Sequence, residues 1–296
     1  AGYPVVCVVT VPDKPAGRGL KLRPSPVKEY ALAHSLPVLQ PENLKEEAFV
    51  QALQGYEPEI GVVVAFRKLP KVVYSIPKLG FFNLHASLLP QYRGAAPINW
   101  AIMNGEKESG VTTFLLSDTI DAGGMLLQSR CTISQDMTAG ELHDALAVLG
   151  APLVVETVQG LAQGTLHATE QSVVEPLRPA PKIFRADCKV DWSQNGEKIH
   201  NFIRGLSPYP GAWSILRIGS KEEDVKLFDS FLLPASLRGT SSVVGSVAIH
   251  PDRRSLVVTT GQNTSLHIAS IQPAGKRRMS VHDFLLGIPT DELCFV

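Results

Sequence analysis

Short apolar runs rich in β-branched residues recur along the first part of the chain, and amphipathic stretches separate them. A continuous apolar run of this kind is typical of a strand that is buried on both faces of a parallel sheet. The pattern predicts strands over residues 5–10, 36–39, 60–65, 81–85, 111–116 and 125–133. It predicts helices over residues 26–34, 45–54, 68–75, 97–104 and 138–163. Strands that alternate with helices indicate βαβ units, so we expect an α/β domain with a mainly parallel sheet.

The pattern changes after about residue 166. Residues 171–187 contain three prolines and no clear period, which is typical of a linker. Beyond them, two helices (197–205 and 280–286) accompany short strands expected over residues 212–218, 225–233, 245–250, 255–261 and 265–271. Short strands between Gly, Asn and Asp turns indicate a small antiparallel barrel, with an OB-like barrel as the leading choice. We therefore expect a first domain at 1–170, a linker at 171–187 and a second domain at 188–296.

Composition narrows the class of protein further. The 28 basic and 28 acidic residues among 296 cancel, so a site for a polyanion must be a local patch. The four cysteines are far apart in sequence, which argues against a zinc site or a disulfide framework and fits a reducing compartment. No uninterrupted apolar run approaches the ~18 residues of a membrane span. The first residues resemble neither a signal peptide nor a transit peptide, so the sequence predicts an intracellular protein.

The strongest candidate chemistry lies at the end of the predicted strand 81–85. Asn83 and His85 are two residues apart, so strand periodicity turns both side chains to one face. Asp121 lies in an acidic turn after the next predicted strand, and adjacent parallel strands deliver their loops to the same crevice. Taken alone, His85 reads more simply as a satisfied strand-end residue and Asp121 as a turn residue.

Together, these three groups suit transfer at a carbonyl carbon. The Asn83 amide donates to a developing oxyanion, the His85 imidazole donates a hydrogen bond or moves a proton, and the Asp121 carboxylate fixes the tautomer of the imidazole. No Gly-x-Ser-x-Gly nucleophile motif is present in the sequence. Its absence favours direct attack by the acceptor substrate over a covalent enzyme intermediate.

Two basic stretches are candidates for contact with nucleic acid. The polar loop at 11–25 carries Lys14, Arg18, Lys21 and Arg23 against the single acid Asp13, and this excess of cations suits phosphate neutralisation. An ordinary solvated loop is the alternative. A second cluster of cations consists of Lys276, Arg277 and Arg278, for which an ordinary loop before the last helix is the alternative.

The motifs extend well beyond these residues. Around the three catalytic candidates the chain reads Asn83-Leu84-His85, Ser87-Leu88-Leu89-Pro90, Arg93-Gly94, Pro97-Ile98, Gly110-Val111-Thr112 and Asp118-Thr119-Ile120-Asp121-Ala122-Gly123. Three outlying stretches are residues 12–19 with 24–28, residues 190–193 and residues 272–280. In these motifs the chain resembles the 10-formyltetrahydrofolate-dependent formyltransferases, and within that family the members that formylate methionyl-tRNA. The resemblance covers nearly the whole chain.

The resemblance implies a Rossmann-like amino-terminal formyltransferase domain and a carboxyl-terminal OB-like domain that binds tRNA. It implies that Asn83 and His85 stabilise the oxyanion while Asp121 orients His85. The amino group of methionine on initiator tRNA would attack the formyl carbon of 10-formyltetrahydrofolate, without a metal. The implied cofactor-binding residues follow the catalytic strand and are Ser87, Leu88, Leu89, Pro90, Arg93, Gly94 and Pro97.

The same resemblance implies the partners and the compartment. The loop after the second strand of the family inserts into the acceptor stem of tRNA, which makes Lys14, Arg18, Lys21 and Arg23 the expected contacts, with 276–278 as an extension. The expected partners are initiator methionyl-tRNA and the folate co-substrate, with no membrane or DNA, and the protein is expected to be a monomer. The expected compartment is a bacterial-type cytoplasm, with a mitochondrion or another organelle as the alternative.

Two departures from the family pattern stand out. The family usually opens with a central strand, a Gly-bearing turn and a helix before the strand at 5–10, so we expect the sheet of this chain to lack its first strand. The given sequence is then either incomplete at its start or a truncated form. The acidic turn reads Asp121-Ala122-Gly123-Gly124 where the family commonly has Asp-Thr-Gly-Asp. The lost hydroxyl and carboxylate could loosen the turn that aims Asp121.

Two other functions stay open at this point. A related enzyme would formylate a nucleotide sugar or a purine precursor, or would hydrolyse the folate to formate. A truncated form would bind folate or tRNA without turnover. We set aside a dehydrogenase that uses a nicotinamide dinucleotide, because no Gly-x-Gly-x-x-Gly follows a predicted strand.

Overall fold

The computed structural model describes residues 2–16, 21–172, 175–232, 243–288 and 293–296. Its contacts divide the chain into two units that interleave along the sequence. Unit 1 comprises Ala1–His85, Val111–Ser129 and Leu149–Glu175. Unit 2 comprises Ala86–Gly110, Arg130–Val148 and Pro176–Val296. Three elements run from one unit into the other along the chain: β7 (Glu108–Leu115), β8 (Met125–Thr132) and α5 (Ala139–Ala162).

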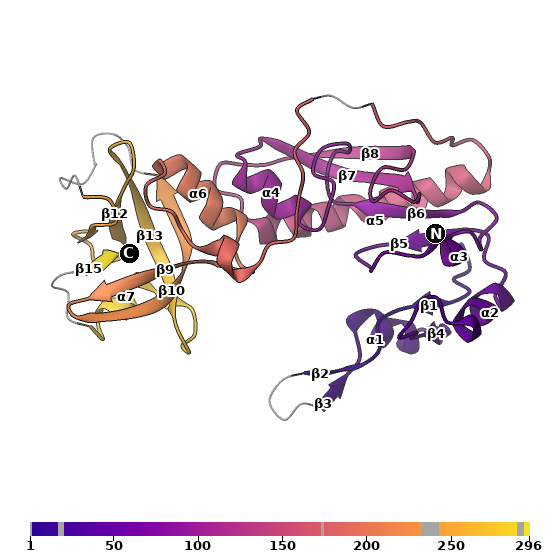
Figure 1. Cartoon of the computed structure of the whole chain (residues 1–296), viewed down its shortest axis with the longest axis horizontal. Helices are drawn as coiled ribbons and strands as arrows, with labels where there is room; N and C mark the ends of the chain where they lie inside the picture. The colour runs from indigo at the N-terminus through magenta and orange to yellow at the C-terminus, as the bar shows by residue number, and fades with distance from the viewer. Residues whose placement is uncertain (1, 17–20, 173–174, 233–242, 289–292) are drawn as a thin grey trace. The chain divides into compact units, whose positions relative to one another are not determined.

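Unit 1 follows the predicted alternation of strands and helices (Figure 1). Its strands are β1 (Val8–Val9), β2 (Lys14–Ala16), β3 (Lys21–Arg23), β4 (Val38–Leu39), β5 (Gly61–Val63) and β6 (Phe81–His85). Its helices are α1 (Pro26–Ala33), α2 (Glu47–Gly55) and α3 (Lys71–Tyr74). Helix α1 begins as expected, because the Ser25 hydroxyl accepts a hydrogen bond from Lys28 N at 3.2 Å and Pro26 occupies the first helical position.

The α/β fold class is confirmed, but the expectation of one mainly parallel sheet needs correction. Strand β1 pairs with β4 in a parallel two-stranded sheet, whereas β5, β6, β7 and β8 form a separate sheet in that order. Strand β6 is parallel to β5 but antiparallel to β7, with Phe82 opposite Leu115 and His85 opposite Thr112. Apolar runs predict buried strands without specifying their direction or partners, because both depend on contacts distant in sequence.

The segment at 11–25 is not wholly a loop. Strands β2 and β3 form an antiparallel hairpin in which Lys14 is opposite Arg23. The acid of this segment, Asp13, is bound by Lys28 of α1 at 2.8 Å and by Gln40 at 2.8 Å. These hydrogen bonds, with that of Lys28 as the larger cause, lower the pKa of Asp13.

Helix α5 covers one face of the four-stranded sheet (Figure 1). Its start was predicted by a capping box, and Thr138 N and Oγ1 both donate to Glu141 Oε2 at 2.8 Å. Its buried positions recur every three or four residues, as expected of a helix that packs on one side. Gly150 permits close approach, because a Cβ there would meet the Leu84 side chain at 2.7 Å. By length and composition alone, α5 is also apolar enough to cross a membrane, although a core helix passes the same test. This property was not detected in the sequence because only uninterrupted apolar runs were considered there.

Unit 2 contains an antiparallel barrel flanked by helices (Figure 1). Its helices are α4 (Pro97–Met103), the 3-10 helix η1 (Arg185–Cys188), α6 (Gly196–Gly205) and α7 (Val281–Leu285). Its strands are β9 (Ala212–Ile218), β10 (Lys221–Leu232), β11 (Val247–Ile249), β12 (Leu256–Thr260), β13 (Thr264–Pro273), β14 (Met279–Ser280) and β15 (Leu293–Phe295). The order β11-β12-β13-β10-β9-β15 nearly closes, because Ser246 and Cys294 form a bridge between the two ends. The prediction of a small antiparallel barrel is confirmed.

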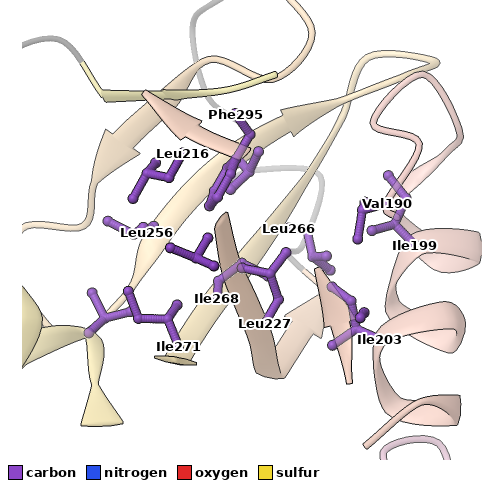
Figure 2. Packing of buried hydrophobic residues seen from close by; sticks show 14 of the residues in the cluster. Val190, Ile199, Ile203, Leu216, Leu227, Leu256, Leu266, Ile268, Ile271 and Phe295 are labelled. Carbon is purple, nitrogen blue, oxygen red and sulfur yellow. The ribbon is translucent and has the colours of Figure 1, made fainter. Parts of the chain in front are cut away.

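Most of the side chains that fill the barrel interior are aliphatic, and the Phe295 ring packs among them (Figure 2). Leu227 on β10 and Ile268 on β13 are fully buried, and Ile203 of α6 packs against the same cluster. Each such side chain contributes roughly 1.5–3 kcal/mol to folding by leaving water. Alternate positions along β9 point inward, as expected of a strand with one face on the core.

A polar cluster anchors α6 within unit 2. His200 is 2% exposed, and its Nδ1 lies 2.9 Å from Ser230 Oγ of β10. Its Nε2 lies 3.2 Å from Asp136 Oδ1. Arg204, one helical turn further on, donates to Met137 O at 2.7 Å. Burial lowers the pKa of His200, and this effect outweighs the opposing influence of the Gln135 carbonyl and of Asp136.

This cluster predicts a specific acid sensitivity. The unfolded chain takes up a proton at His200 below its ordinary pKa of about 6.5, whereas the folded protein resists doing so, and therefore the free energy of unfolding falls as pH decreases. We expect His200→Gln to reduce this fall between about pH 7.5 and about pH 5.5. Denaturant titrations of both proteins at the two pH values measure the difference. Identical pH dependence in the two proteins would remove His200 from the account.

Candidate active site

Strand β6 presents Asn83 and His85 on one face of its sheet. The intervening Leu84 points the other way, toward Gly150 of α5. Across the sheet Asn83 is opposite Phe114 and His85 is opposite Thr112, so these four residues share a face. The period of two that predicted this arrangement from sequence is confirmed.

The structure also brings Asp121 to His85. Asp121 Oδ2 lies 3.9 Å from His85 Nδ1, and the two side chains are only 13% and 7% exposed. This separation is in the range of an ion pair and longer than a direct hydrogen bond. The Phe114 ring stands edge-on to the imidazole with 6.4 Å between centroids. The imidazole therefore lies in a partly dry environment beside a carboxylate.

The expected route to this contact was wrong. Strands β6 and β7 are antiparallel, so their carboxyl ends do not lie at the same edge of the sheet. Asp121 reaches His85 from the connection between β7 and β8, where its backbone adopts a left-handed conformation with φ of 52°. Non-glycine residues rarely adopt this conformation unless their surroundings hold them, and it is often found at functional sites.

Gln171 supplies part of that hold. Its Nε2 donates to Asp121 O at 2.9 Å and to Gly123 O at 2.8 Å. Sequence analysis missed Gln171, which it placed at the start of a linker, because no local pattern links it to a turn so far away in sequence. The turn has Ala122 and Gly124 where a hydroxyl and a carboxylate were expected, and Gln171 offers a substitute source of rigidity.

Asn83 carries an unsatisfied group. Its Oδ1 is buried and has no hydrogen-bond partner among the described residues. A buried carbonyl oxygen without a donor costs about 1–3 kcal/mol, and such an atom calls for an explanation. An N–H or O–H of a bound ligand is one partner that would satisfy this atom.

The predicted cofactor residues lie in the segment 87–97, which belongs to unit 2 and connects β6 to α4. Ser87 is fully buried and its Oγ donates to Gln91 O at 2.7 Å. Leu89 is 3% exposed, and Pro97 opens α4 as predicted. The remaining predicted residues are Leu88, Pro90, Arg93 and Gly94, and they complete the same ordered loop.

The predicted tRNA contacts are only partly described. Lys14 and Arg23 are exposed on the β2–β3 hairpin. Lys21 opens β3, and Arg18 lies outside the described residues.

In unit 2, Lys276 and Arg277 are exposed, but Arg278 is engaged within the unit. Arg278 binds Asp229 Oδ2 at 2.6 Å and Ser270 Oγ at 2.9 Å, and its guanidinium lies 4.4 Å from the centre of the Phe228 ring. Arg278, one of the three clustered cations, therefore has a structural role within unit 2. Among the described residues, no group of three or more His, Cys, Asp or Glu side chains is arranged to hold a metal ion.

Comparisons with known proteins place this site in a family. Residues 2–158 match the family model described as formyl transferase, and residues 182–289 match that of the formyl transferase C-terminal domain. The methionyl-tRNA formyltransferase of Bacteroides fragilis is 46% identical over 98% of this chain and 90% of its own length. That of Parabacteroides distasonis is 48% identical over 97% of this chain and 89% of its own length.

Solved structures share the fold at low identity. HypX from Aquifex aeolicus in complex with tetrahydrofolic acid has a TM-score of 0.62 at 20% identity, over 90% of this chain and 47% of that one. The sugar 3N-formyl transferase WlaRD has a TM-score of 0.59 at 18% identity, over 84% of this chain and 82% of that one. The formyl transferase family models and the relatives of 46–48% identity make this chain a one-carbon group transferase. The chain belongs to the formyl transferase family.

The clamp on the acidic turn generates a prediction. We expect Gln171→Ala to lower the turnover number for formyl transfer by about 10-fold, because the Asp121 carboxylate loses its fixed aim. Gln171→Glu, which keeps the size but removes both donated hydrogen bonds, should behave alike. Gln51→Ala, on the exposed face of α2, is the matched control. Steady-state rates and melting temperatures measure the effect, and a normal rate in Gln171→Ala would contradict it.

Proposed function

We propose that this chain transfers the formyl group of 10-formyltetrahydrofolate to the amino group of methionine esterified to initiator tRNA. The high identity to methionyl-tRNA formyltransferases over nearly the whole of both chains supports this acceptor. The observation that carries the chemistry is the buried His85–Asp121 pair on the face of β6 that also bears Asn83. The proposal assigns the reaction to these three residues.

In the proposed mechanism, the side-chain amide of Asn83 binds both reacting groups, the formyl group through Nδ2 and the attacking amine through Oδ1. Its Nδ2 donates a hydrogen bond to the oxygen of the formyl group, where negative charge develops during attack. Its buried Oδ1 accepts an N–H of the attacking amine, which supplies the partner that this atom lacks among the residues that the structure describes. Asn83 therefore aligns the amine with the formyl carbon.

His85 takes the proton that the amine loses. The Asp121 carboxylate lies on the Nδ1 side of the ring and favours the tautomer that carries its proton on Nδ1. In that tautomer Nε2 is the basic nitrogen, which can accept a proton from the amine and pass it to the leaving nitrogen of the folate. Asp121 also stabilises the imidazolium that forms in between.

The proposal assigns RNA binding to two basic regions. The β2–β3 hairpin presents Lys14 and Arg23, while Lys28 and Gln40 bind its acid Asp13. Lys276 and Arg277, which are exposed in unit 2, form the second of these regions. The segment 87–97 would receive the folate.

The proposal also includes domain boundaries at 1–170, 171–187 and 188–296, a monomeric state and a cytoplasmic location.

One assay tests the proposal directly. The chain is incubated with 10-formyltetrahydrofolate labelled in its formyl carbon and with charged initiator methionyl-tRNA, free methionine or an amino sugar nucleotide. We expect label in the methionyl-tRNA alone. Label in the amino sugar would show that an amino sugar nucleotide, and not methionyl-tRNA, is the acceptor. Release of free formate alone would indicate a hydrolase. Binding of tRNA without any transfer would indicate a binding protein.

The catalytic assignment predicts strong and selective effects. We expect His85→Ala and Asp121→Asn each to lower turnover by about 10²-fold or more with the fold intact, because both changes disrupt proton transfer at the imidazole. Asp118→Asn, in the same turn but bound to Tyr74 at 2.5 Å, is the matched control. Turnover is measured at saturating concentrations of both substrates, and circular dichroism checks the fold. Unchanged turnover in Asp121→Asn would remove Asp121 from the mechanism.

The hairpin assignment predicts a salt-dependent effect. We expect Lys14→Ala to weaken tRNA binding and to reduce the slope of log affinity against log salt by about 1, as for one lost phosphate contact. Lys45→Ala, another exposed lysine of unit 1, should leave both quantities unchanged. Filter binding across a salt series provides the measurement. A slope equal to that of the unaltered chain would take Lys14 off the RNA surface.

A further inference from the structure

Residues 176–181, here called the strap, belong to the stretch whose composition predicted a linker. In unit 2 the strap is bound along the segment 91–100. Ala180 N donates to Arg93 O at 2.8 Å, and Gly94 forms a parallel bridge with Ala180. Gly94 has φ of 127° and would bring a Cβ into the Ala180 carbonyl, so only glycine permits this approach.

Side chains of the loop add further bonds to the strap. The Gln91 amide binds it twice, because Arg178 N donates to Gln91 Oε1 at 2.8 Å and Gln91 Nε2 donates to Pro176 O at 3.3 Å. Trp100 Nε1, in α4, donates to Pro181 O at 2.8 Å. The strap is therefore hydrogen-bonded at both of its ends and at its centre to the loop that carries the proposed folate-binding residues.

The Arg178 side chain closes a polar cluster beneath this loop. The Tyr92 hydroxyl donates to Glu106 Oε1 at 2.6 Å and accepts from Asn104 Nδ2 at 3.2 Å. Arg178 Nη1 donates to the same hydroxyl at 3.4 Å and forms an ion pair with Glu106. Burial is the largest cause that raises the pKa of Tyr92, so the phenol stays protonated and continues to donate.

Tyr92 connects this polar cluster to the loop at 87–97, because it belongs to both. It is only 5% exposed, and its backbone is left-handed, with φ of 60°. This conformation is unfavourable for a residue with a Cβ, so contacts must hold it. The strap supplies one of them, because Tyr92 N donates to Arg178 O at 2.7 Å. Arg178 thus holds both the backbone and the side chain of Tyr92, immediately before Arg93 and Gly94.

We infer that Arg178 is a positioning residue for the formyl donor, which acts through Tyr92 and Glu106 to hold the loop at 87–97 in its donor-binding conformation. The inference rests on the proposed function, since it takes this loop as the folate site. Removal of the Arg178 side chain leaves the backbone hydrogen bonds of the strap in place. Unit 2 therefore stays folded, and the cost falls on the binding of the donor.

The test compares binding of the donor with binding of the tRNA in the full chain. Arg178→Met removes the hydrogen bond to Tyr92 and the ion pair with Glu106, while Arg178→Lys keeps a cation for Glu106 and serves as the conservative rescue. Arg130→Met, which breaks the exposed Arg130–Glu108 pair in the same unit, is the matched control. Calorimetric titration with folinic acid, a stable formyl folate, gives Kd, and steady-state rates give KM for each substrate.

We expect Arg178→Met to raise the Kd of folinic acid and the KM of the donor by about fivefold or more, with a smaller change in the KM of tRNA and in kcat. Arg178→Lys should restore part of the loss, and Arg130→Met should bind folinic acid like the unaltered chain. Equal Kd values for Arg178→Met and Arg130→Met would overturn the inference alone. So would a parallel loss for both substrates with a lowered melting temperature. A failure of the unaltered chain to bind folinic acid would overturn the proposed folate chemistry and this inference with it.

Discussion

The candidate site depends on the alternation of side chains along one short strand. Strand β6 turns Asn83 and His85 to one face and Leu84 to the other, where α5 packs. A shift of one residue in the pairing of β6 with β7 would bury the amide and the imidazole against that helix. The packing of Leu84 therefore favours this register of the strand and, through it, the direction of the two side chains to which the proposal assigns catalysis.

Residues far along the chain from β6 hold the two loops of the candidate site, which are the turn at Asp121 and the loop at 87–97. The amide of Gln171 bonds to the backbone of the Asp121 turn, and the strap with Arg178 bonds to the loop around Tyr92. In both cases a residue with a left-handed backbone is fixed by hydrogen bonds from a distant part of the chain. Pre-organisation of this kind spares the enzyme the cost of ordering these loops when substrates bind.

Charge is used locally in this electrically neutral chain. The acid of the β2–β3 hairpin is bound by Lys28 and Gln40, whereas Lys14 and Arg23 are exposed. Arg278 differs from these two residues, because its guanidinium binds Asp229 and packs on the Phe228 ring. The basic run in the sequence had made it a candidate for RNA contact. A charge count therefore finds candidate surfaces, and only the neighbours of each side chain decide which cations are available.

The sequence alone predicted most of the helices and strands, the barrel in the second half, and Asn83, His85 and Asp121 as candidates for the site. Local signals suffice for these, since side-chain periods, helix caps and motif spacing act within a few residues. The tertiary structure decided the antiparallel pairing of β6 with β7, the approach of Asp121 from a folded-back turn, and the roles of Gln171 and Arg178. These depend on hydrogen bonds between residues far apart in the chain. No local pattern encodes such bonds, because they exist only once the packed core has brought their partners together.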